Sequence, residues 1–506
     1  MKSLTVKLMY RMRVADFGLL ACVVAVGLVV GCARSTLPLT NLTLPLPASP
    51  ITMESVKEVF GSYREGNFQN RSRTDAFLGM HQKFVREYPF SEWKGIDWDT
   101  LYDTHVPRVE AASQAKDELA YYLALRSYLY SIPDAGVSIS TPDAYRDAAV
   151  GAGFGFSMLP LDDGRVVVVR VEPGFFADMA GIEWGAEIIA WNGLPIAEAL
   201  EQTSLLWSDA PPATDECRRF EQCALLTRAP AGTKATLKFR NPESDEVWIT
   251  QLEARRDFYR SLEDLTRQKK TITEFDSPLE TRILDGNIGY IQIYCHAATL
   301  AMPFPARAFR NAMEQFLKAD VAGLVLDLRG DVGGQDQLAV TYAGHFTKSP
   351  LFYRNVVAFD YDKGGFALKE DASMTIEPRA PYFGGPVMVL IQHTTRDNGQ
   401  ALADSLHQLP NVALMGFTGT DGSWSFPGGQ VTVPGGHVIT YPIGRFLDST
   451  DTIRVTSSGK MESRVKPDIR VPLTFEAYES FFREDRDVVL ERAIAEIKVR
   501  AAAKTK

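Results

Sequence analysis

Residues 323–334 read GLVLDLRGDVGG, and this stretch decides the fold. Its apolar run predicts a buried strand over Gly323–Leu328, and its glycines predict a tight turn directly after that strand. Further strands are predicted at Ile288–Tyr294, Val387–Gln392 and Val412–Gly416, with helices between them such as Pro305–Lys318, and with a last helix over Asp487–Lys498. Strands and helices that alternate in this way indicate an α/β fold with a mainly parallel sheet.

Residues 391–406, IQHTTRDNGQALADSL, end one of these strands and begin a helical pattern. A strand, a tight turn and a helix are a common seat for a catalytic nucleophile. The turn contains Asp397, Asn398 and Gly399, and it has neither serine nor cysteine. Two alternatives follow: an active site that uses another residue, or one that has lost its chemistry.

The composition is typical of a globular protein of two or three domains, with 506 residues, 45% hydrophobic and 23% charged. The net charge is −9 and no basic patch is interleaved with aromatic residues, so nucleic acid is not expected as a partner. The seven histidines and five cysteines show no metal-ligand spacing. Neither a metal nor another cofactor is expected.

Residues 1–31 are typical of a signal peptide, because a basic start precedes an apolar run over Phe17–Val30 that is short for a membrane-spanning helix. Leu28–Cys32 resembles the lipobox of bacterial lipoproteins. That resemblance implies that Cys32 becomes the lipidated first residue and anchors a periplasm-facing protein of the cell envelope, and Ala33 favours the outer membrane. The alternative is a plain anchor helix with a cysteine by chance.

Four segments follow the signal peptide. Residues 32–50, rich in Pro, Leu, Ser and Thr, are predicted to form a tether. Residues 51–147 are predicted to be mostly helical, since Glu118–Leu129 repeats apolar residues at helical spacing. Residues 148–255 change to short strands and turns, and residues 256–506 contain the alternating strands and helices.

The order of elements in residues 148–255 resembles a PDZ domain. A Gly-Phe-Gly-Phe loop is followed by a strand over Arg165–Val171, a short helix over Ala177–Gly181, and a strand and turn over Ile188–Gly193. The resemblance implies that the backbone N–H groups of the loop bind a C-terminal carboxylate, while the peptide adds as a strand. The loop consists of Gly153, Phe154, Gly155 and Phe156. The alternative is an ordinary turn without a ligand.

Residues 256–506 resemble the C-terminal-processing, or tail-specific, serine peptidases, because the strand and glycine turn of residues 323–334 look like their signature. The helical region, the PDZ-like domain and the Val465–Ile469 tail match the family in order. In detail the sequence is nearer the tricorn-like branch, which uses serine, histidine and glutamate, than the serine–lysine branch. The resemblance implies a crotonase/ClpP-like α/β peptidase core in which Gly333 and Gly334 aim N–H groups at a developing oxyanion. The alternative is a turn that only joins strand to helix.

The family's catalytic positions carry other residues here. Laid on the family pattern, the serine falls on Asp397, the glutamate three residues later falls on Gln400, and the histidine falls on Gly136. The lysine of the other branch falls on Gly422 or a neighbour. The late glutamate of the triad is retained as Glu462, for which an ordinary surface glutamate is the alternative.

No neighbouring residue is a good replacement for the missing serine nucleophile or for its base. A carboxylate that attacks an amide gives a mixed anhydride and expels a bad leaving group, so Asp397 is not expected to act as nucleophile. Thr394 and Thr395 precede it with side chains expected to point elsewhere, and Ser405 lies some two helical turns away. His393 is a candidate base, although a residue that ends a strand is more often structural. The other histidines, among them His296, are taken as ordinary.

Cys217 and Cys223 lie six residues apart in a polar stretch. In an oxidising periplasm they either close a small disulfide loop or are merely neighbours. Cys295 follows an apolar strand and is predicted to be a buried thiol.

Our first hypothesis is a catalytically impaired member of the peptidase family that acts as a tethered peptide-binding or scaffold protein. Its expected partners are polypeptide C-termini or unfolded proteins, together with the membrane through the lipid anchor. The alternative is an active serine-type endopeptidase that cleaves envelope proteins from their C-termini with a displaced catalytic set. A purely structural envelope protein is a third possibility.

Overall fold

The computed structural model describes residues 66–262 and 272–504. The predicted signal peptide over residues 1–31, the predicted lipidation site Cys32 and the predicted tether over residues 32–50 lie outside the described residues. Within the described ranges, no helix combines the length and the apolar character that a membrane crossing requires.

The α/β core is built on a six-stranded sheet with the order β12-β13-β14-β18-β19-β24. These strands are β12 (Leu279–Leu284), β13 (Ile288–Ile293), β14 (Gly323–Asp327), β18 (Val387–Leu390), β19 (Val412–Gly416) and β24 (Ile469–Arg470). β12 runs antiparallel to β13, and all other neighbours are parallel. The parallel sheet predicted from the alternating pattern is confirmed.

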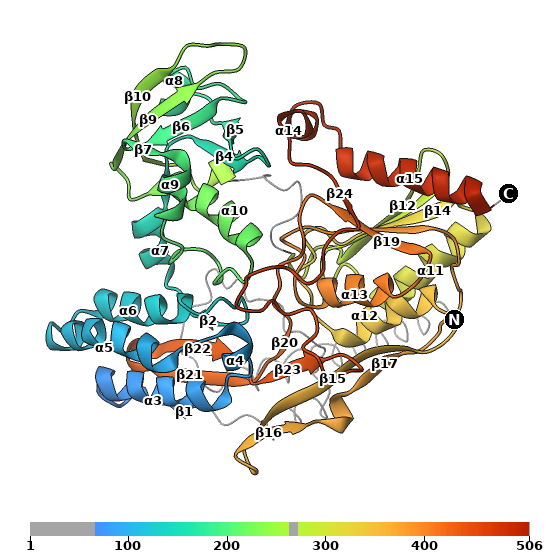
Figure 1. Cartoon of the computed structure of the whole chain (residues 1–506), viewed down its shortest axis with the longest axis horizontal. Coiled ribbons are helices and arrows are strands. Elements are labelled where there is room, and N and C mark those ends of the chain that lie inside the picture. Colours follow the sequence, from blue (N-terminus) through green and yellow to red (C-terminus); the bar gives the residue numbers. More distant parts are fainter. Residues whose placement is uncertain (1–65, 263–271, 505–506) are drawn as a thin grey trace, which may run out of the picture. The chain divides into compact units, whose positions relative to one another are not determined.

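Helices cover both faces of this sheet (Figure 1). α11 (Pro305–Lys318), α12 (Asp336–Ala343) and α13 (Asp397–His407) pack on one face, and α15 (Val488–Lys504) packs on the other. α11 has the predicted bounds; its proline stands in the first turn, where the missing N–H costs nothing. Because β14, β18 and β19 are buried along their whole length, they hold the loops at their carboxyl ends rigidly.

A second, antiparallel sheet packs against α12 and α13, and the sequence patterns did not predict it. Its strands are β15 (Leu351–Asp360), β16 (Gly365–Leu368), β17 (Met374–Ile376), β20 (Ser425–Phe426) and β23 (Gly444–Leu447). Tyr353, Val356 and Phe446 of this sheet belong to the same apolar core as Leu402 of α13.

The N-terminal helices are confirmed, and three of them begin at residues whose side chains cap the first turn. The helices are α3 (Arg73–Glu87), α4 (Ser91–Lys94), α5 (Trp98–Gln114) and α6 (Glu118–Tyr130). Ser72, Asp97 and Asp117 accept hydrogen bonds from N–H groups of α3, α5 and α6. The helices share a core with a sheet of β1 (Gly66–Asn67), β21 (Gly429–Val433), β22 (His437–Tyr441) and β2 (Ser138–Ile139). Strands from the C-terminal half therefore complete the N-terminal region.

Residues 148–255 form most of a β-rich region with its own apolar core. Its main sheet has the order β10-β9-β6-β5-β4, with β7 (Leu194–Pro195) beside β6. The strands are β4 (Phe156–Pro160), β5 (Val166–Val171), β6 (Glu187–Trp191), β9 (Lys234–Arg240) and β10 (Trp248–Glu253). A small sheet joins β11 (Arg255–Arg256), β3 (Ala152–Gly153) and β8 (Arg228–Ala229).

Short helices surround this region. They are α7 (Asp143–Val150), α8 (Phe176–Met179), α9 (Ile196–Glu201) and α10 (Asp215–Leu226). α10 lies along β4, and α14 (Phe475–Phe482) packs against β5 on the other face of the sheet. The strands and the short helix predicted here are confirmed, whereas α10 was read from the sequence only as a polar stretch.

Candidate active site

Asp397 stands at a sharp bend between β18 and α13. It is the first residue of the helix, and its backbone has a φ of +45°, which is uncommon for a residue with a side chain. Arg396 before it is extended, with φ −122° and ψ 163°. The strand–turn–helix seat predicted for a nucleophile is therefore formed, and an acid occupies it.

The Asp397 carboxyl group lies against the glycine turn that follows β14. The Gly334 N–H donates a hydrogen bond to Asp397 Oδ2 with an N···O distance of 3.4 Å. Gly333 and Gly334 have φ values of +81° and +138°, and a Cβ on Gly333 would lie only 2.4 Å from the Cβ of Asp397. Glycine is therefore required at 333 by conformation and by space.

Burial and a neighbouring carboxylate shift the titration of Asp397. Desolvation, followed by repulsion from Asp336, raises its pKa to about 7, against smaller lowering effects from the Gly334 hydrogen bond and from His296. Asp336 is itself held by the Arg354 guanidinium at 2.6 Å, by the Tyr353 hydroxyl and by the Asn398 side-chain amide. Of these two carboxyl groups, only Asp336 is paired with a cation among the residues that the structure describes.

His296 and Asp331 complete the site behind the glycine turn. His296 Nε2 lies 3.1 Å from Asp331 Oδ2, and both side chains are fully buried. The backbone N–H of His296 donates to the Gly333 carbonyl oxygen, and the backbone N–H of Gly333 donates to Asp331 Oδ1. Neither ring nitrogen of His296 has a hydrogen bond of good geometry. This pair is buried and its contacts order the glycine turn.

The sequence analysis treated His296 as ordinary, and the structure buries it behind the glycine turn. A signal for this position was present in the order of the strands. β13, β14 and β18 are parallel neighbours, so the segments after them, which carry His296, Asp331 and Asp397, meet at one edge of the sheet. Polar residues that follow adjacent parallel strands are the expected site builders in such folds.

Ser423 contacts both Gln400 and the segment that contains Gly136. Gln400 is fully buried; its side-chain amide donates to Ser423 O at 2.5 Å and accepts from the Gly422 N–H and from Thr420 Oγ1. The N–H of Ala135, next to Gly136, donates to Ser423 Oγ at 3.0 Å. The positions aligned with the family's glutamate and histidine therefore lie near α13, but they provide an amide and a hydrogen atom instead of a carboxylate and an imidazole.

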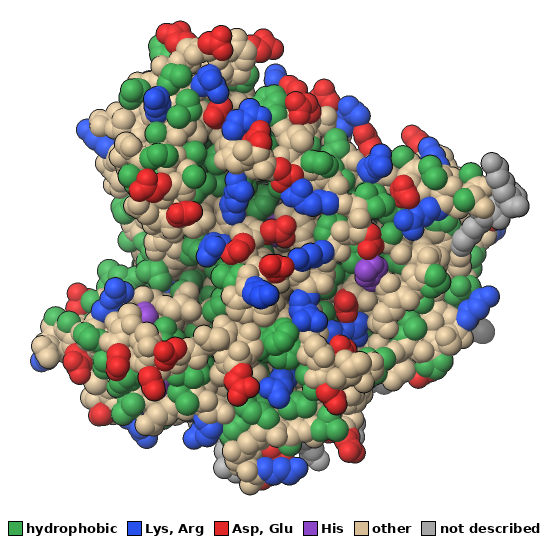
Figure 2. Space-filling view, viewed as in Figure 1, with side chains coloured by type: hydrophobic (Ala, Val, Ile, Leu, Met, Phe, Trp, Pro, Cys, Tyr) green, Lys and Arg blue, Asp and Glu red, His purple; other side chains and the backbone are tan. Residues whose placement is uncertain are grey.

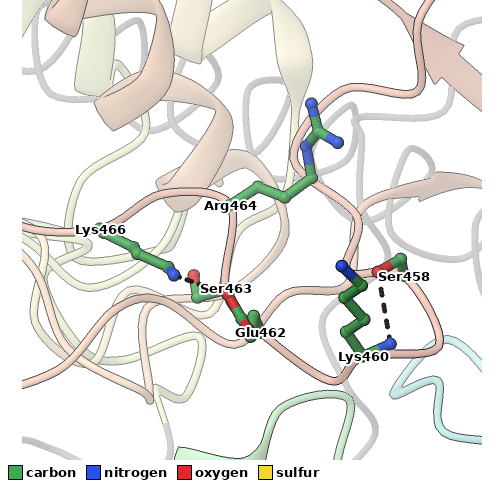
Figure 3. Close-up of a pocket in the computed structure, with 6 residues that line it drawn as sticks. All are labelled: Ser458, Lys460, Glu462, Ser463, Arg464 and Lys466. Carbon is green, nitrogen blue, oxygen red and sulfur yellow. Dashed lines mark hydrogen bonds and ion pairs between the residues drawn. The ribbon is translucent and has the colours of Figure 1, made fainter.

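Glu462 lies apart from these residues, on a surface loop (Figure 3). Its side chain is 65% exposed and forms an ion pair with Lys466 at 2.9 Å. Ser458, Lys460, Ser463, Arg464 and Lys466 surround it in an open cavity of about 330 Å³. Among the described residues, Glu462 forms no hydrogen bond or ion pair with Asp397 or Gln400, so the interpretation of Glu462 as an ordinary surface glutamate fits the structure.

The other hydroxyl groups near the bend are occupied in structural hydrogen bonds. Thr395 Oγ1 donates to Leu328 O, Ser405 Oγ donates to Ala401 O, and Thr394 Oγ1 accepts from Gln392. Both Thr395 and Ser405 are fully buried. None of these three hydroxyl groups is paired with an imidazole or an amine.

The candidate bases are also unsuitable. His393 stacks on Phe220 at 4.0 Å, and burial lowers its pKa to about 3. Lys94 does donate to a serine hydroxyl, that of Ser457 at 3.3 Å. However, Ser457 is fully buried and donates its proton to Ala213 O, so this pair joins segments of the protein and cannot meet a substrate.

The loop predicted to bind peptides is largely internal. Phe154 and Phe156 are 2% and 0% exposed and belong to the core of the β-rich region. Gly155 has a φ of +86°, and a Cβ there would lie 2.5 Å from that of Phe175. The Phe154 N–H donates to Thr227 O, and Gly153 pairs with Arg228 and Arg255 in the small sheet. The Phe154 N–H is thus already engaged.

A cavity of about 360 Å³ lies beside Phe154. The side chains that line it include Trp191, Leu194, Leu225 and Lys234.

Cys217 and Cys223 are separate buried thiols, so the disulfide alternative was wrong. Both lie on α10, where six residues turn about 600° around the helix axis and leave the two side chains about 120° apart, on different faces. Cys217 faces the His393 carbonyl, whereas Cys223 enters the core of the β-rich region. Cys295 is a buried thiol, as predicted.

No cluster of three or more His, Cys, Asp or Glu side chains with the geometry of a metal site occurs in residues 66–262 and 272–504.

Part of the sequence matches a known protein family. Residues 287–471 match peptidase family S41. Carboxy-terminal processing protease CtpA of Bacillus subtilis (strain 168) is 25% identical over 259 residues, which are 51% of this chain and 44% of that protein. The chloroplastic carboxyl-terminal-processing peptidase 3 of Arabidopsis thaliana is 23% identical over 412 residues, 79% of this chain and 67% of that protein. The chain thus spans less than half the length of the first of these relatives.

The crystal structure of mature CPAF has the same fold. It superposes with a TM-score of 0.59 at 13% identity, covering 83% of this chain and 97% of that one. The mixed α/β architecture of the whole described chain, with its N-terminal helices and β-rich region, therefore has a counterpart among solved structures. Together, the sequence match and the fold establish that this chain carries a peptidase family S41 domain over residues 287–471 and is a homologue of C-terminal processing proteases.

Proposed function

We propose that this protein binds polypeptides on a peptidase scaffold without hydrolysing them. The observation that carries the proposal is the Asp397 carboxyl group against the Gly333–Gly334 turn, at the position where the family resemblance expects the attacking serine. Acyl transfer from a peptide needs a nucleophile that a base activates. A carboxylate is a poor substitute, because its attack on an amide gives an anhydride that is higher in energy than the amide.

The occupied glycine turn supports the same proposal. An oxyanion site works when its N–H donors point at the place where negative charge develops. Here the Gly334 N–H already points at Asp397 Oδ2. A substrate carbonyl would have to displace this side chain, and a tetrahedral oxyanion would meet the repulsion of a carboxylate once Asp397 ionises above its pKa of about 7.

For the ligand, we propose a polypeptide with an apolar C-terminal residue, bound in a PDZ-like manner by the β-rich region. The cavity beside Phe154 offers apolar walls from Trp191 and Leu225, and Lys234, which also lines it, carries an ammonium group that suits a terminal carboxylate. This places the ligand beside the Gly153–Phe156 loop. It does not require the Phe154 N–H, which is engaged with Thr227 O.

The lipobox-like Leu28–Cys32 segment supports a place in the cell envelope of a bacterium, with the described domains in the periplasm and the lipid in the outer membrane. A scaffold or peptide-holding role agrees with such a tether, because the anchor keeps the binding site close to envelope proteins as their C-termini emerge.

Peptide binding is tested by titrating fluorescent peptides that end in leucine, valine or aspartate and measuring polarisation. We expect the apolar ends to bind and the acidic end to bind at least about tenfold more weakly, since a charged side chain loses its hydration in an apolar cavity. Leu225→Glu and Lys234→Ala should weaken binding. Lys238→Ala, on the same strand but outside the cavity, is the matched control and should not.

The decayed active site is tested by restoring it. Asp397→Ser with Gly136→His reinstates the two groups that the family pattern expects, and a Cβ at Gly136 meets only the Ser425 and Asp134 side chains and Pro442 at 3.1–3.5 Å. We expect slow cleavage of an unfolded protein by this variant and none by the matched Asp397→Ala, Gly136→His variant. Equal cleavage by both variants would mean that another residue is the nucleophile.

A further inference from the structure

β10 is an edge strand without the usual protection against pairing. Among the described strands it pairs only with β9, and the register runs without a bulge from Trp248 opposite Phe239 to Glu253 opposite Lys234. Natural edge strands commonly carry lysine, proline or a bulge that prevents another strand from adding. The segment Trp248–Leu252, WITQL, has none of these, and the only charged residue of the strand is Glu253 at its end. Its outer row of backbone N–H and C=O groups therefore faces solvent in a regular array.

Apolar side chains line this edge. Trp248 and Ile249 are 48% and 70% exposed, and Val247 just before them is 41% exposed. Met179 of α8, a helix that contacts β10, is 72% exposed. Trp248 and Ile249 point to opposite faces of the sheet, so the side chains of a strand that adds to β10 would pack beside apolar groups on both faces, which favours association through the burial of apolar surface.

The charges on either side of the strand have opposite signs. Glu243, Asp245 and Glu246 precede it and are exposed, and Arg255 and Arg256 follow it and are exposed. None of these five residues forms an ion pair in the part of the chain that the structure describes, although the Arg255 guanidinium stacks on the Phe176 ring at 3.8 Å. Figure 2 shows acidic side chains gathered at the top of the view, over the loop that joins β9 to β10.

We propose that a second copy of this chain adds to β10 as an antiparallel strand, so that two β-rich regions share one continuous sheet. In a symmetric pair, the acidic flank of each copy lies beside the basic flank of the other, because the two strands run in opposite directions. The strand is thus complementary to itself in charge as well as in backbone hydrogen bonding. This complementarity is the reason to name a second copy as the occupant in place of an unrelated peptide.

The geometry limits the register to two choices near the strand centre. A two-fold axis perpendicular to the sheet keeps the solvent face of one copy continuous with that of the other, so residues of the same face must stand opposite each other. If the pairing continued beyond the ends of β10, centring on Thr250 would set Asp245 opposite Arg255 of the second copy, and Arg255 also pairs with Gly153 in the small sheet. Centring on Gln251 sets Glu246 opposite Arg256. Residues of opposite charge therefore face each other in both registers.

The test uses the full-length chain in detergent and two charge-reversal variants. One carries Asp245→Lys and Glu246→Lys, and the other carries Arg255→Glu and Arg256→Glu. Each variant alone places like charges opposite each other, whereas a mixed pair of the two variants restores opposite charges on both sides. Sedimentation equilibrium of each variant and of their equimolar mixture measures the association.

We expect the wild-type chain to form a dimer whose association constant falls about tenfold or more in each variant alone and recovers in the mixture. Ile249→Lys, which adds an edge lysine at a 70% exposed position without touching β11, should also abolish the dimer. If each variant unfolds at the same temperature as the wild-type chain, the loss of the dimer is not caused by misfolding.

The proposal is overturned if the wild-type chain stays monomeric up to about 1 mM, a concentration at which even weak pairs form. It is also overturned if the dimer survives Ile249→Lys, or if the mixture fails to recover while both variants remain folded. Binding of extended peptides to a monomeric wild-type chain would assign the edge to another partner and would equally contradict a second copy.

Discussion

Asp397 Oδ2 lies 3.4 Å from the backbone nitrogen of Gly334, so the acid at the start of α13 closes onto the glycine turn at the end of β14. These two elements are far apart in sequence and are brought together by the parallel pairing of β14 with β18. Asp397, which makes this contact, has an unusual backbone φ of +45° at the bend. Its side chain leaves no space for a side chain at position 333.

The raised pKa of Asp397 predicts a pH-dependent stability. Its folded value of about 7 exceeds the ordinary 3.8, so the stabilisation is complete below about pH 4 and is lost as the pH rises through 7. Between pH 5 and 8 the free energy of unfolding should fall by roughly 3 kcal/mol more in the wild-type chain than in Asp397→Asn. Urea unfolding across this range measures the difference. Asp320→Asn, at an exposed position with a φ of +50°, is the control and should leave the wild-type slope unchanged.

Gly333→Ala should destabilise the protein through both conformation and contact. The left-handed backbone costs about 1–2 kcal/mol, and the clash with the Asp397 Cβ adds about 1–3 kcal/mol. Gly364→Ala has a similar φ of +68° with no atom within 4 Å, so it should show only the first cost. Adding Asp397→Gly to Gly333→Ala should recover at least about 1 kcal/mol in thermal unfolding. If the changes in stability caused by Gly333→Ala and by Asp397→Gly simply add in the double variant, the two side chains are not in contact.

Gln400→Glu should weaken the protein near neutral pH, because the new carboxylate would face the Ser423 carbonyl where the amide now donates. We expect a loss of about 1–3 kcal/mol at pH 7, which decreases at acidic pH as the glutamic acid becomes protonated and can donate again. Gln408→Glu, at an exposed position after the same helix, should change the stability by less than about 0.5 kcal/mol. A Gln400→Glu variant as stable as the wild-type chain at pH 7 would contradict the buried amide network.

Cys217, Cys223 and Cys295 should all be free thiols that react only after unfolding. Burial raises the pKa of Cys223 and of Cys295 to about 12, and that of Cys217 is raised further in the same direction, so little thiolate is available in the folded chain. Thiol titration should therefore give almost no rapid reaction before denaturant is added, and reductant should not shift the unfolding transition. A shift on adding reductant would mean that a disulfide does form.

Sequence patterns predicted the elements whose residues are close together in the chain. The strand over Gly323–Asp327 and the helix over Pro305–Lys318 follow from local apolar runs and an N-terminal proline. The pairing of β21 and β22 with β1 and β2 depends on contacts across more than 300 residues, for which a local pattern carries no signal. His296 was missed for the same reason, because its role arises from the order of strands in the sheet.

The bend at Asp397 could be predicted because strand, turn and helix are contiguous, and the altered residues at 136 and 400 followed from the resemblance. The position of Glu462 could not, because a match in spacing along the chain does not fix where a surface loop lies. Its ion pair with Lys466 shows that the charge is satisfied locally.

Peptide-bond cleavage by the wild-type chain would show whether a working nucleophile is present. Purified full-length protein is incubated with an unfolded substrate protein, and new termini are identified by mass spectrometry. The account predicts no cleavage above that of a heat-denatured sample. Cleavage that persists through purification and disappears in Asp397→Ala or Ser405→Ala would contradict it, because a working nucleophile would then stand at a position assigned here to binding or structure.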